Sequence, residues 1–458
     1  MHLDPNHVVF IIGSNARIHS FSVTSEMKRV ICWLALLGIS LVSGQNQQDE
    51  LWLRITATSG RQRLNLVIAE FSAQKGFPKD TINILQSIQQ VFEADLRFSL
   101  YFTFQQPESG AAFGFETAMH KVDLKAWGST GAEVLICGDL TRKRSGPILQ
   151  IWLYDLLTCR RIATKPYRFR KQWRRLAHEI ADDVIKLLTG EQGVSRTRIA
   201  FSRSLGNGRK ELALLDYDGA ALVSITNSGG VKLFPDFSPD GNKLAYCAYG
   251  KHSLNIYTLD IQTRKRKTLS ERPGLNTTPA WSPDNKTIAV SLSFRGQSDI
   301  YLMDPKGHNL SRLTTSHAID ISPTWSPSGR QLAFVSDRTG TPQVYIMNAD
   351  GIDLHRLTFE GSYNTSPAWS PRGDMVAFVQ RQPDGSNQVC ATNITGDTYL
   401  RLTSRGSNED PIWSPDGLHI AFSSNRSGHY EIYTMDWNGA HQKCITRTKG
   451  AFSPTWSH

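Results

Sequence analysis

The chain has 458 residues and a formal net charge of +10, with 51 Lys and Arg against 41 Asp and Glu. This length leaves room for two or three domains with well-packed cores. The positive charge favours acidic partners, but a nucleic-acid-binding protein is not expected, because the sequence has no long basic block, no zinc-ligand spacing and no aromatics interleaved with the charges.

The N-terminal region has the three parts of a secretory signal peptide. Residues 27–29 form a basic start, residues 30–42 an apolar stretch, and residues 42–44 a small-residue cleavage site. The apolar stretch is too short to span a bilayer comfortably, and no later segment reaches about 18 apolar residues. We therefore expect residues 1–44 to be a signal-peptide region, with Met27 as an alternative translation start. Cleavage would leave no membrane insertion, whereas an uncleaved anchor is the alternative.

A short polar segment follows the predicted cleavage site. It lacks apolar periodicity and has no reason to fold alone, so we expect a flexible arm at the mature N-terminus that orders when it binds a partner. The arm consists of Gln45, Asn46, Gln47, Gln48, Asp49 and Glu50.

Residues 45–190 are predicted to form an α/β domain, followed by a linker at residues 191–197. Strand-like segments are combined with two amphipathic helices. The first helix is expected to begin with Asp80 as its cap, and the second to run over residues 172–189 and end at Gly190. An oxidising compartment would permit a bridge between Cys137 and Cys159, although we expect these thiols to stay unpaired.

Signals of catalysis are weak. His178 begins a zincin-like motif, but Asp182 stands where the second His ligand is required, so we predict a solvated helix face there. Gly206 and Gly208 lack the third glycine of a dinucleotide-binding loop. The sequence also has no Gly-x-Ser-x-Gly elbow. We therefore expect a protein that is not an enzyme and needs no cofactor or metal.

The C-terminal half repeats a motif of Pro, any residue, an aromatic, Ser and Pro about every 44 residues. The sequence between two motifs has room for four short strands, with a tight turn directly after the motif. A period of this length with strand-like content is typical of a β-propeller blade. The repeated aromatics are expected to pack between blades; they are Phe237, Trp281, Trp325, Trp369, Trp413 and Trp456.

The number of strands predicts a closed ring of six blades. Residues 199–201, 212–215 and 223–226 supply three strands ahead of the first motif, with no innermost strand of their own. The last motif, at Trp456, has no strand after it. Residues 198–458 are therefore predicted to form an all-β six-bladed propeller that the C-terminal strand closes, following the α/β domain.

One end of this propeller is the predicted binding face. Two residues precede the Pro of each motif, and we expect them in the loops around the mouth of the central channel. They are Leu233, Phe234, Thr277, Thr278, Ile321, Ser322, Thr365, Ser366, Glu409, Asp410, Phe452 and Ser453.

A cation also follows the second strand of every predicted blade, at the same end of the ring. The six are Arg203, Lys251, Arg295, Arg338, Arg381 and Arg426. Together they would form a positive collar that speeds the encounter with an acidic partner. The alternative is that the exposed loops of a basic protein simply contain Arg and Lys.

Segments on both sides of the domain junction resemble one family. Residues 171–175, 187–190 and 196–201 are similar to the junction between the α/β domain and the propeller in the TolB family. Trp127 and residues 131–138 are similar to the α/β core of that family. The blade motif matches as well, so that the resemblance covers nearly all of the chain beyond the signal-peptide region.

This resemblance implies a periplasmic component of the Tol-Pal system, which supports outer-membrane integrity and invagination during division of Gram-negative bacteria. It implies a Pal-like outer-membrane lipoprotein at the propeller face and a TolA-like inner-membrane protein at the mature N-terminus. The side chains at the face differ from the family's, so the location carries over better than individual contacts. We expect a monomer. A generic secreted propeller that binds a small ligand or polyanion in its channel stays open as the second hypothesis.

Overall fold

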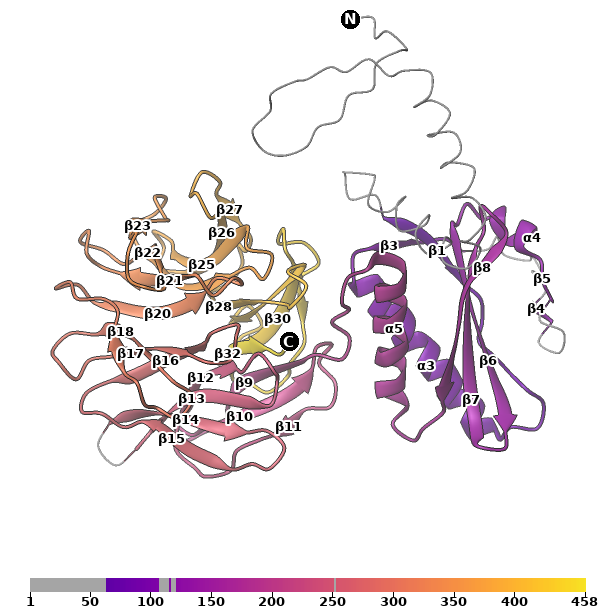
Figure 1. Ribbon diagram of the computed structural model, residues 1–458, viewed down its shortest axis with the longest axis horizontal. Helices are drawn as coiled ribbons and strands as arrows, with labels where there is room; N and C mark the ends of the chain where they lie inside the picture. Colours follow the sequence, from indigo (N-terminus) through magenta and orange to yellow (C-terminus); the bar gives the residue numbers. More distant parts are fainter. Residues whose placement is uncertain (1–62, 107–114, 117–120, 251–252) are drawn as a thin grey trace, which may run out of the picture.

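The computed structural model describes residues 63–106, 115–116, 121–250 and 253–458, which form two bodies joined by a short linker (Figure 1). The predicted signal-peptide region, the N-terminal arm and Lys251 lie outside the described residues. Within the described ranges, no helix has the length and apolar character needed to cross a membrane.

The N-terminal body is built on a mixed sheet with the spatial order β3-β1-β6-β7-β8, and β2 also pairs with β6. Strand β1 runs parallel to β3 and β6, whereas β6, β7 and β8 form an antiparallel meander. The strands are β1 (Leu64–Ile68), β2 (Ser72–Ala73), β3 (Phe102–Phe104), β6 (Val134–Lys143), β7 (Gly146–Asp155) and β8 (Arg160–Arg168). A small hairpin, β4 (Phe115–Glu116) and β5 (Lys121–Val122), leads into the short helix α4 (Leu124–Gly128).

Two long helices share one hydrophobic core with this sheet: α3 (Lys79–Phe98) and α5 (Trp173–Thr189). Helix α5 ends as predicted, because Gly190 adopts a left-handed φ of 77° that few other residues tolerate. The predicted cap of α3 is wrong. Pro78 holds the cap position, and Asp80 lies inside the first turn, where its charge still suits the positive end of the helix dipole.

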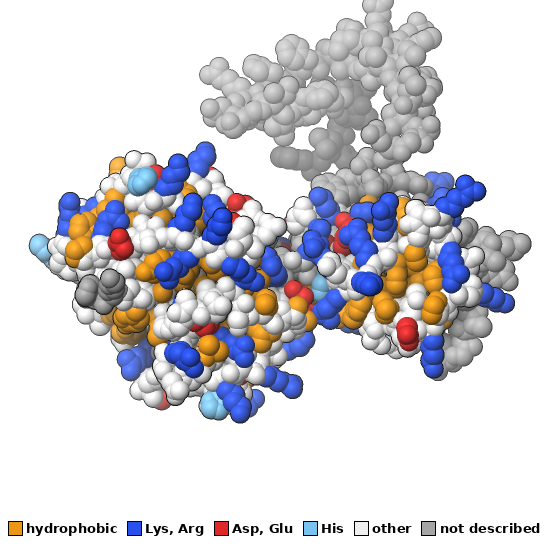
Figure 2. Space-filling view, turned by 90° about the horizontal axis from the view of Figure 1, so that it is seen from below, with side chains coloured by type: hydrophobic (Ala, Val, Ile, Leu, Met, Phe, Trp, Pro, Cys, Tyr) orange, Lys and Arg blue, Asp and Glu red, His pale blue; other side chains and the backbone are white. Residues whose placement is uncertain are grey.

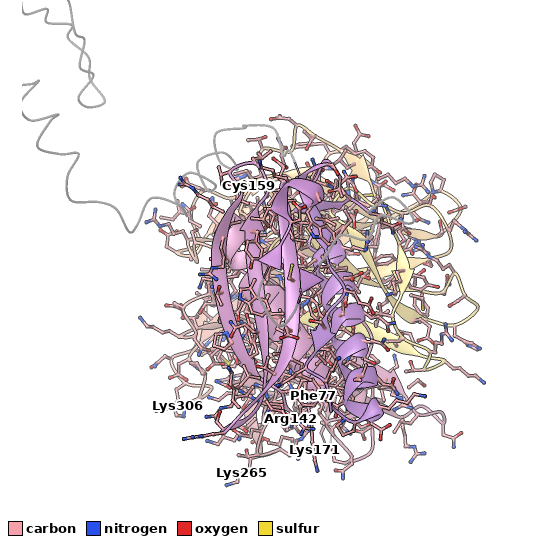
Figure 3. All side chains as sticks on the ribbon, turned by 90° about the vertical axis from the view of Figure 1, so that its right-hand side faces the viewer. Phe77, Arg142, Cys159, Lys171, Lys265 and Lys306 are labelled. Atoms are coloured by element: carbon pink, nitrogen blue, oxygen red, sulfur yellow. The ribbon has the colours of Figure 1, made fainter. Side chains whose placement is uncertain are left out.

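Figure 3 looks onto this domain and shows Cys159 at one end of the sheet and Phe77 with Arg142 at the other. The Arg142 guanidinium lies 4.9 Å from the Phe77 ring centre and donates to the Gly76 carbonyl at 2.6 Å. Cys159 is exposed and Cys137 is buried in β6, and both are free thiols. Burial raises the pKa of Cys137 to about 12, so this thiol is unreactive.

The C-terminal body is a propeller of six four-stranded antiparallel sheets. The innermost strands are β12 (Lys232–Phe237), β16 (Asn276–Trp281), β20 (Asp320–Trp325), β24 (Asn364–Trp369), β28 (Asn408–Trp413) and β32 (Ala451–Trp456). The second strands are β9 (Arg198–Ser204), β13 (Lys243–Tyr249), β17 (Ile288–Leu292), β21 (Gln331–Ser336), β25 (Met375–Arg381) and β29 (His419–Ser424).

The outer half of each blade holds two further strands. The third strands are β10 (Lys210–Asp216), β14 (Leu254–Asp260), β18 (Asp299–Met303), β22 (Gln343–Asn348), β26 (Asn387–Asn393) and β30 (Glu431–Asp436). The fourth strands are β11 (Val223–Ser224), β15 (Arg266–Ser270), β19 (Ser311–Arg312), β23 (His355–Arg356), β27 (Leu400–Arg401) and β31 (Lys443–Cys444).

The ring closes as the sequence predicts. The C-terminal strand β32 is the innermost strand of the first blade, where Trp456 pairs with Ile199 of β9. The indole Nε1 of Trp456 donates to Thr197 Oγ1 at 2.7 Å, and the ring is buried. The repeated aromatics pack between blades, also as predicted. For example, the indole of Trp413 donates to the carbonyl of Ala368 on the preceding innermost strand at 3.0 Å.

At three junctions, a polar contact joins neighbouring blades where a third strand lies beside the next innermost strand. Between the β22 and β24 blades, Asn364 Nδ2 donates to Gln343 Oε1 at 2.7 Å. At the equivalent junction between β10 and β12 the contact is ionic, because Lys232 Nζ lies 3.0 Å from Glu211 Oε1. Both side chains of this ion pair are 3% exposed or less.

The two bodies meet through the long helices. Phe98, at the end of α3, stacks on His419 of β29 with 3.7 Å between ring centres. The Tyr217 hydroxyl donates to Asp95 Oδ1 at 2.5 Å, and Asp95 Oδ2 lies 2.7 Å from His178 Nδ1. These contacts tie α3 and α5 to the first and last blades.

The prediction of a solvated helix face at His178 and Asp182 is wrong. His178 is 4% exposed and Asp182 is 3% exposed. Asp182 Oδ1 accepts from the Ser195 amide at 2.8 Å, and its Oδ2 accepts from Arg196 Nε at 2.8 Å. The linker supplies the partners of Asp182, whereas His178 is paired with Asp95 of α3 and packs against the Tyr217 ring of the propeller.

Candidate binding site at the propeller channel

Every innermost strand carries a β-bulge just before its Pro. In β16, Thr277 pairs with Ser291, the register then shifts, and Ala280 pairs with Ala289. Thr278 lies at this bulge with a φ of 44°. A bulge leaves one residue out of the ladder and re-aims its side chain. The equivalent residues, also with positive φ, are Phe234, Ser322, Ser366, Asp410 and Ser453.

These bulges correct one expectation about the predicted face. The residues before each Pro lie inside the innermost strands, and not in the preceding loops. The first residue of each pair still bonds to the second strand, as Leu233 does opposite Cys247. The bulge residue lines a hollow of about 150 Å³ at the channel mouth, together with the Pro that follows it. The bulge interrupts the alternation of inward and outward side chains by which a strand is recognised in the sequence.

Asp410 connects three innermost strands across this mouth. Its Oδ2 accepts from Ser453 Oγ at 2.8 Å, and its Oδ1 accepts from Ser366 Oγ at 3.3 Å. Burial raises the pKa of Asp410 above its ordinary value. Beside it, Glu409 Oε1 accepts from the Tyr430 hydroxyl at 2.8 Å. A second hollow of about 330 Å³ opens next to both carboxylates.

The predicted positive collar is not a ring of equivalent free cations. Arg338 donates to both carboxylate oxygens of Asp320, at 3.0 and 3.1 Å. Arg426 donates to Asn408 Oδ1 at 2.6 Å and to Ser424 Oγ at 2.8 Å. Each guanidinium is therefore tied to the first residue of its blade's innermost strand or to its own second strand.

Two other collar positions do present their charge to solvent. Arg295 and Arg381 are both exposed, and their guanidinium carbons lie 5.4 Å from the Phe294 ring centre and 5.8 Å from the Tyr363 ring centre. Figure 2 shows Lys and Arg spread over the visible face of both bodies with few Asp and Glu among them. The positive charge is thus distributed over the surface, as well as present near the mouth.

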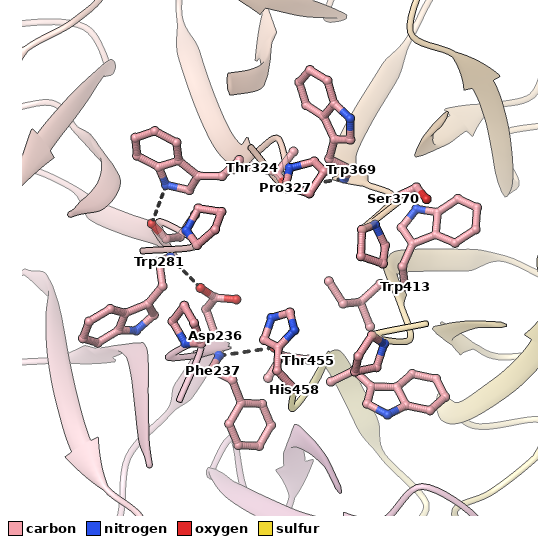
Figure 4. Close-up of a pocket in the computed structure, with 18 of the residues that line it drawn as sticks. Asp236, Phe237, Trp281, Thr324, Pro327, Trp369, Ser370, Trp413, Thr455 and His458 are labelled. Atoms are coloured by element: carbon pink, nitrogen blue, oxygen red, sulfur yellow. Dashed lines mark hydrogen bonds between the residues drawn. The ribbon is translucent and has the colours of Figure 1, made fainter. Parts of the chain in front are cut away.

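The opposite end of the channel widens into a cavity of about 430 Å³. Pro and Trp side chains of the repeated motif line most of its wall, and the ring of His458 projects toward its open centre (Figure 4). Asp236 points into the open centre, and its Oδ2 accepts from the Trp281 amide at 2.8 Å. Burial within the ring raises the pKa of Asp236 to about 7.

Asp236 was not among the residues that the sequence suggested. The signal was present, because Asp is the only charged residue at this phase of the repeat. The equivalent residues are Ala280, Thr324, Ala368, Ile412 and Thr455. Within the described ranges, no group of three or more His, Cys, Asp and Glu is placed to hold a metal ion.

Comparison with known proteins shows that both bodies of the chain are similar to parts of TolB proteins. A family model for the TolB beta propeller domain matches residues 185–458, and one for the TolB amino-terminal domain matches residues 53–162. The Tol-Pal system protein TolB of Geobacter sulfurreducens is 38% identical over 212 residues, which are 46% of this chain and 48% of that protein. The protein of the same name from Anaplasma marginale is 33% identical over 156 residues, 33% of this chain and 35% of that protein.

These matches span about half the length of the curated relatives or less. A solved structure extends the likeness over both bodies. The crystal structure of TolB from Acinetobacter baumannii superimposes with a TM-score of 0.74 at 25% identity, and the match covers 86% of this chain and 97% of that one.

Proposed function

The chain belongs to the TolB family, and from this membership we propose that it is a non-enzymatic periplasmic adaptor of a Tol-Pal system. Its propeller mouth would bind a Pal-like outer-membrane lipoprotein, and its mature N-terminal arm would bind a TolA-like inner-membrane protein. This bridge would support outer-membrane integrity and invagination during division. The observation that carries the proposal is the match of both TolB domain models, in order, to one chain.

The geometry of the mouth supports the placement of the lipoprotein site. Hollows of about 150 and 330 Å³ lie side by side there and share Ser366 and Asp410 in their walls. Recesses with a few polar groups are the usual form of a binding site on a rigid scaffold. The bulges fix these residues within the strands, so little conformational entropy would be lost on binding.

A pull-down from envelope extract tests the proposal. The mature chain should capture one outer-membrane lipoprotein and one inner-membrane Tol protein. A generic secreted propeller would capture neither, and that result would refute the adaptor function.

Charge reversal at the exposed collar positions should slow association with the lipoprotein. We expect Arg295→Glu with Arg381→Glu to reduce the association rate constant several-fold at low salt, because exposed charges steer encounter. The difference should shrink as salt screens them. Folding stability should change by less than about 1 kcal/mol. Stopped-flow measurements at two salt concentrations would show both effects.

The matched control reverses two exposed cations in turns at the opposite end of the blades, Lys265→Glu with Lys306→Glu. This variant has the same net charge as the collar variant and should associate at a rate near that of the unchanged chain. Equal association rates for the two variants would assign the effect to net charge and not to the mouth.

Deletion of the arm should separate the two partners. Removing residues 45–50 is expected to weaken binding of the TolA-like protein while leaving thermal unfolding and lipoprotein binding unchanged, because a polar segment of this kind adds nothing to the core. Isothermal titration with each partner measures this. Undiminished binding of the TolA-like protein would place its site elsewhere.

A further inference from the structure

The two hollows of the channel meet at a ring of shared wall residues, called the waist here, and one of these residues carries a carboxylate. The hollow at the mouth and the cavity at the opposite end share five wall residues, which include Asp236 and its equivalents Ala280, Thr324, Ile412 and Thr455. A group that enters from the mouth would therefore meet Asp236 before it reached the wider cavity. Figure 4 shows the side chain of Asp236 projecting into this passage.

The channel wall offers Asp236 no cation. Among the described residues that line the two hollows there is no Lys or Arg, although the chain as a whole carries a net charge of +10. The other titratable side chains among these lining residues are Asp410 and His458. Asp410 is engaged by two Ser hydroxyls, and burial lowers the pKa of His458, so its ring is neutral near pH 7.

The fold does not require a charge at this position. The other five blades place Ala, Thr or Ile there and build the same bulged strand. A carboxylate that loses solvent without gaining a cation costs free energy. Groups held at such a cost are concentrated at functional sites.

We propose that the channel waist binds the basic side chain of a partner, with its ammonium or guanidinium group against Asp236. The Pro and Trp walls suit the apolar stem of Lys or Arg, whose charged head alone needs a polar contact. A divalent ion fits less well, because it takes several oxygen ligands, and among the described residues of the waist Asp236 alone carries a side-chain carboxylate. This inference deepens the proposed function by naming the group that a partner inserts.

The Trp281 amide is a built-in reporter, since it donates to Asp236 Oδ2. Methylguanidinium chloride, titrated at pH 8, should shift its amide NMR signal with saturation. The shift should be absent in Asp236→Ala, which recreates the residue of two other blades and so should fold. The exposed-acid control Glu271→Ala should respond like the unchanged chain. A linear shift, a shift equal to that with NaCl, or a saturable shift that persists in Asp236→Ala would overturn the site.

The pH dependence follows from the raised pKa of Asp236. At pH 8 the carboxylate is ionised and should bind the probe, whereas at pH 5.5 it is protonated and binding should be lost. The stability contribution has the matching sign: with a folded pKa of about 7 above the unfolded value, Asp236 favours folding at low pH and opposes it above pH 7. Probe binding that stays constant between pH 5.5 and 8 would exclude Asp236 as the ligand.

The soluble domain of the Pal-like lipoprotein gives a separate test. At pH 8 its affinity should fall about tenfold in Asp236→Ala, the loss of one charge-assisted contact. Equal affinity for both chains would show that this partner inserts no basic group. The methylguanidinium titration needs no partner protein. A failed pull-down would therefore refute the adaptor function but not the channel site. A failed titration would refute the channel site but not the adaptor function.

Discussion

Deletion of residues 451–458 is expected to lower the free energy of unfolding by more than about 4 kcal/mol or to prevent soluble folding. The deletion removes all of β32, the innermost strand of the first blade. It takes away the buried Ala451 and Trp456 and leaves the ladder groups of β9 unpaired. An unpaired strand edge next to an apolar core also promotes aggregation. Urea unfolding and size-exclusion chromatography would measure both consequences.

A conservative variant separates strand closure from the loss of one side chain. Trp456→Phe keeps the strand and installs the aromatic that Phe237 supplies in the next blade, so it should cost far less than the deletion. If the shortened chain unfolded at the same urea concentration as the full one, the ring would not depend on this strand for closure.

The propeller was predictable from the sequence because the same motif recurs in each of its six blades, at positions with the same structural environment. A Trp at a fixed phase, such as Trp281 or Trp413, indicates a packed position whatever the details of the blade. Closure of the ring was also predictable. The first blade lacks an innermost strand and the last motif supplies a strand without a blade, so pairing the two removes an exposed strand edge. The bulges were not predictable, because the extra residue disturbs the alternation that marks a strand.

The buried face of α5 could not be predicted from its own residues. His178 and Asp182 look like solvated positions because the sequence of a helix does not show which polar groups have buried partners. The partner of His178 is Asp95, which is 83 positions away in the sequence. Asp182 accepts a hydrogen bond from the backbone amide of Ser195, which lies in the linker. Buried polar residues with distant partners are therefore counted as surface in a sequence-based analysis.

The sequence predicts a binding face at the channel mouth, and this placement as a binding site stays a prediction. Ser366 and Asp410 can be assigned to the mouth because they recur in phase with the motif, and both line the hollow there. The sequence does not show that the charge of Arg338 is paired, since its partner Asp320 is 18 positions away on strand β20. Asp236 was missed because a repeated motif draws attention to what its copies share, whereas this residue is informative because it departs from the others.

Lys232→Asn alone is expected to destabilise the chain by about 3–5 kcal/mol, because it leaves the Glu211 carboxylate buried without its cation. Glu211 has other partners: its Oε1 also accepts from the Gly229 amide at 2.9 Å. Those contacts bring the carboxylate no positive charge. The charge must then be desolvated without an ion pair, which is the costly outcome for a buried group.

The chain itself supplies the rescue variant. Two equivalent junctions hold a neutral pair of Gln and Asn: Gln343 with Asn364 at 2.7 Å, and Gln388 with Asn408 at 2.9 Å. The double variant Glu211→Gln with Lys232→Asn recreates this pair between β10 and β12. It should recover most of the loss, because replacing a buried ion pair by a satisfied neutral one is close to neutral in stability.

A double-mutant cycle on urea unfolding decides this point. We expect each single variant to be clearly less stable than the double variant, with a coupling free energy of about 2 kcal/mol or more. Additive losses would mean that Lys232 and Glu211 act independently, each held by its own backbone and hydroxyl partners. The ion pair would then be a local substitution in one blade and not the charged form of the Gln–Asn contact that two other junctions hold.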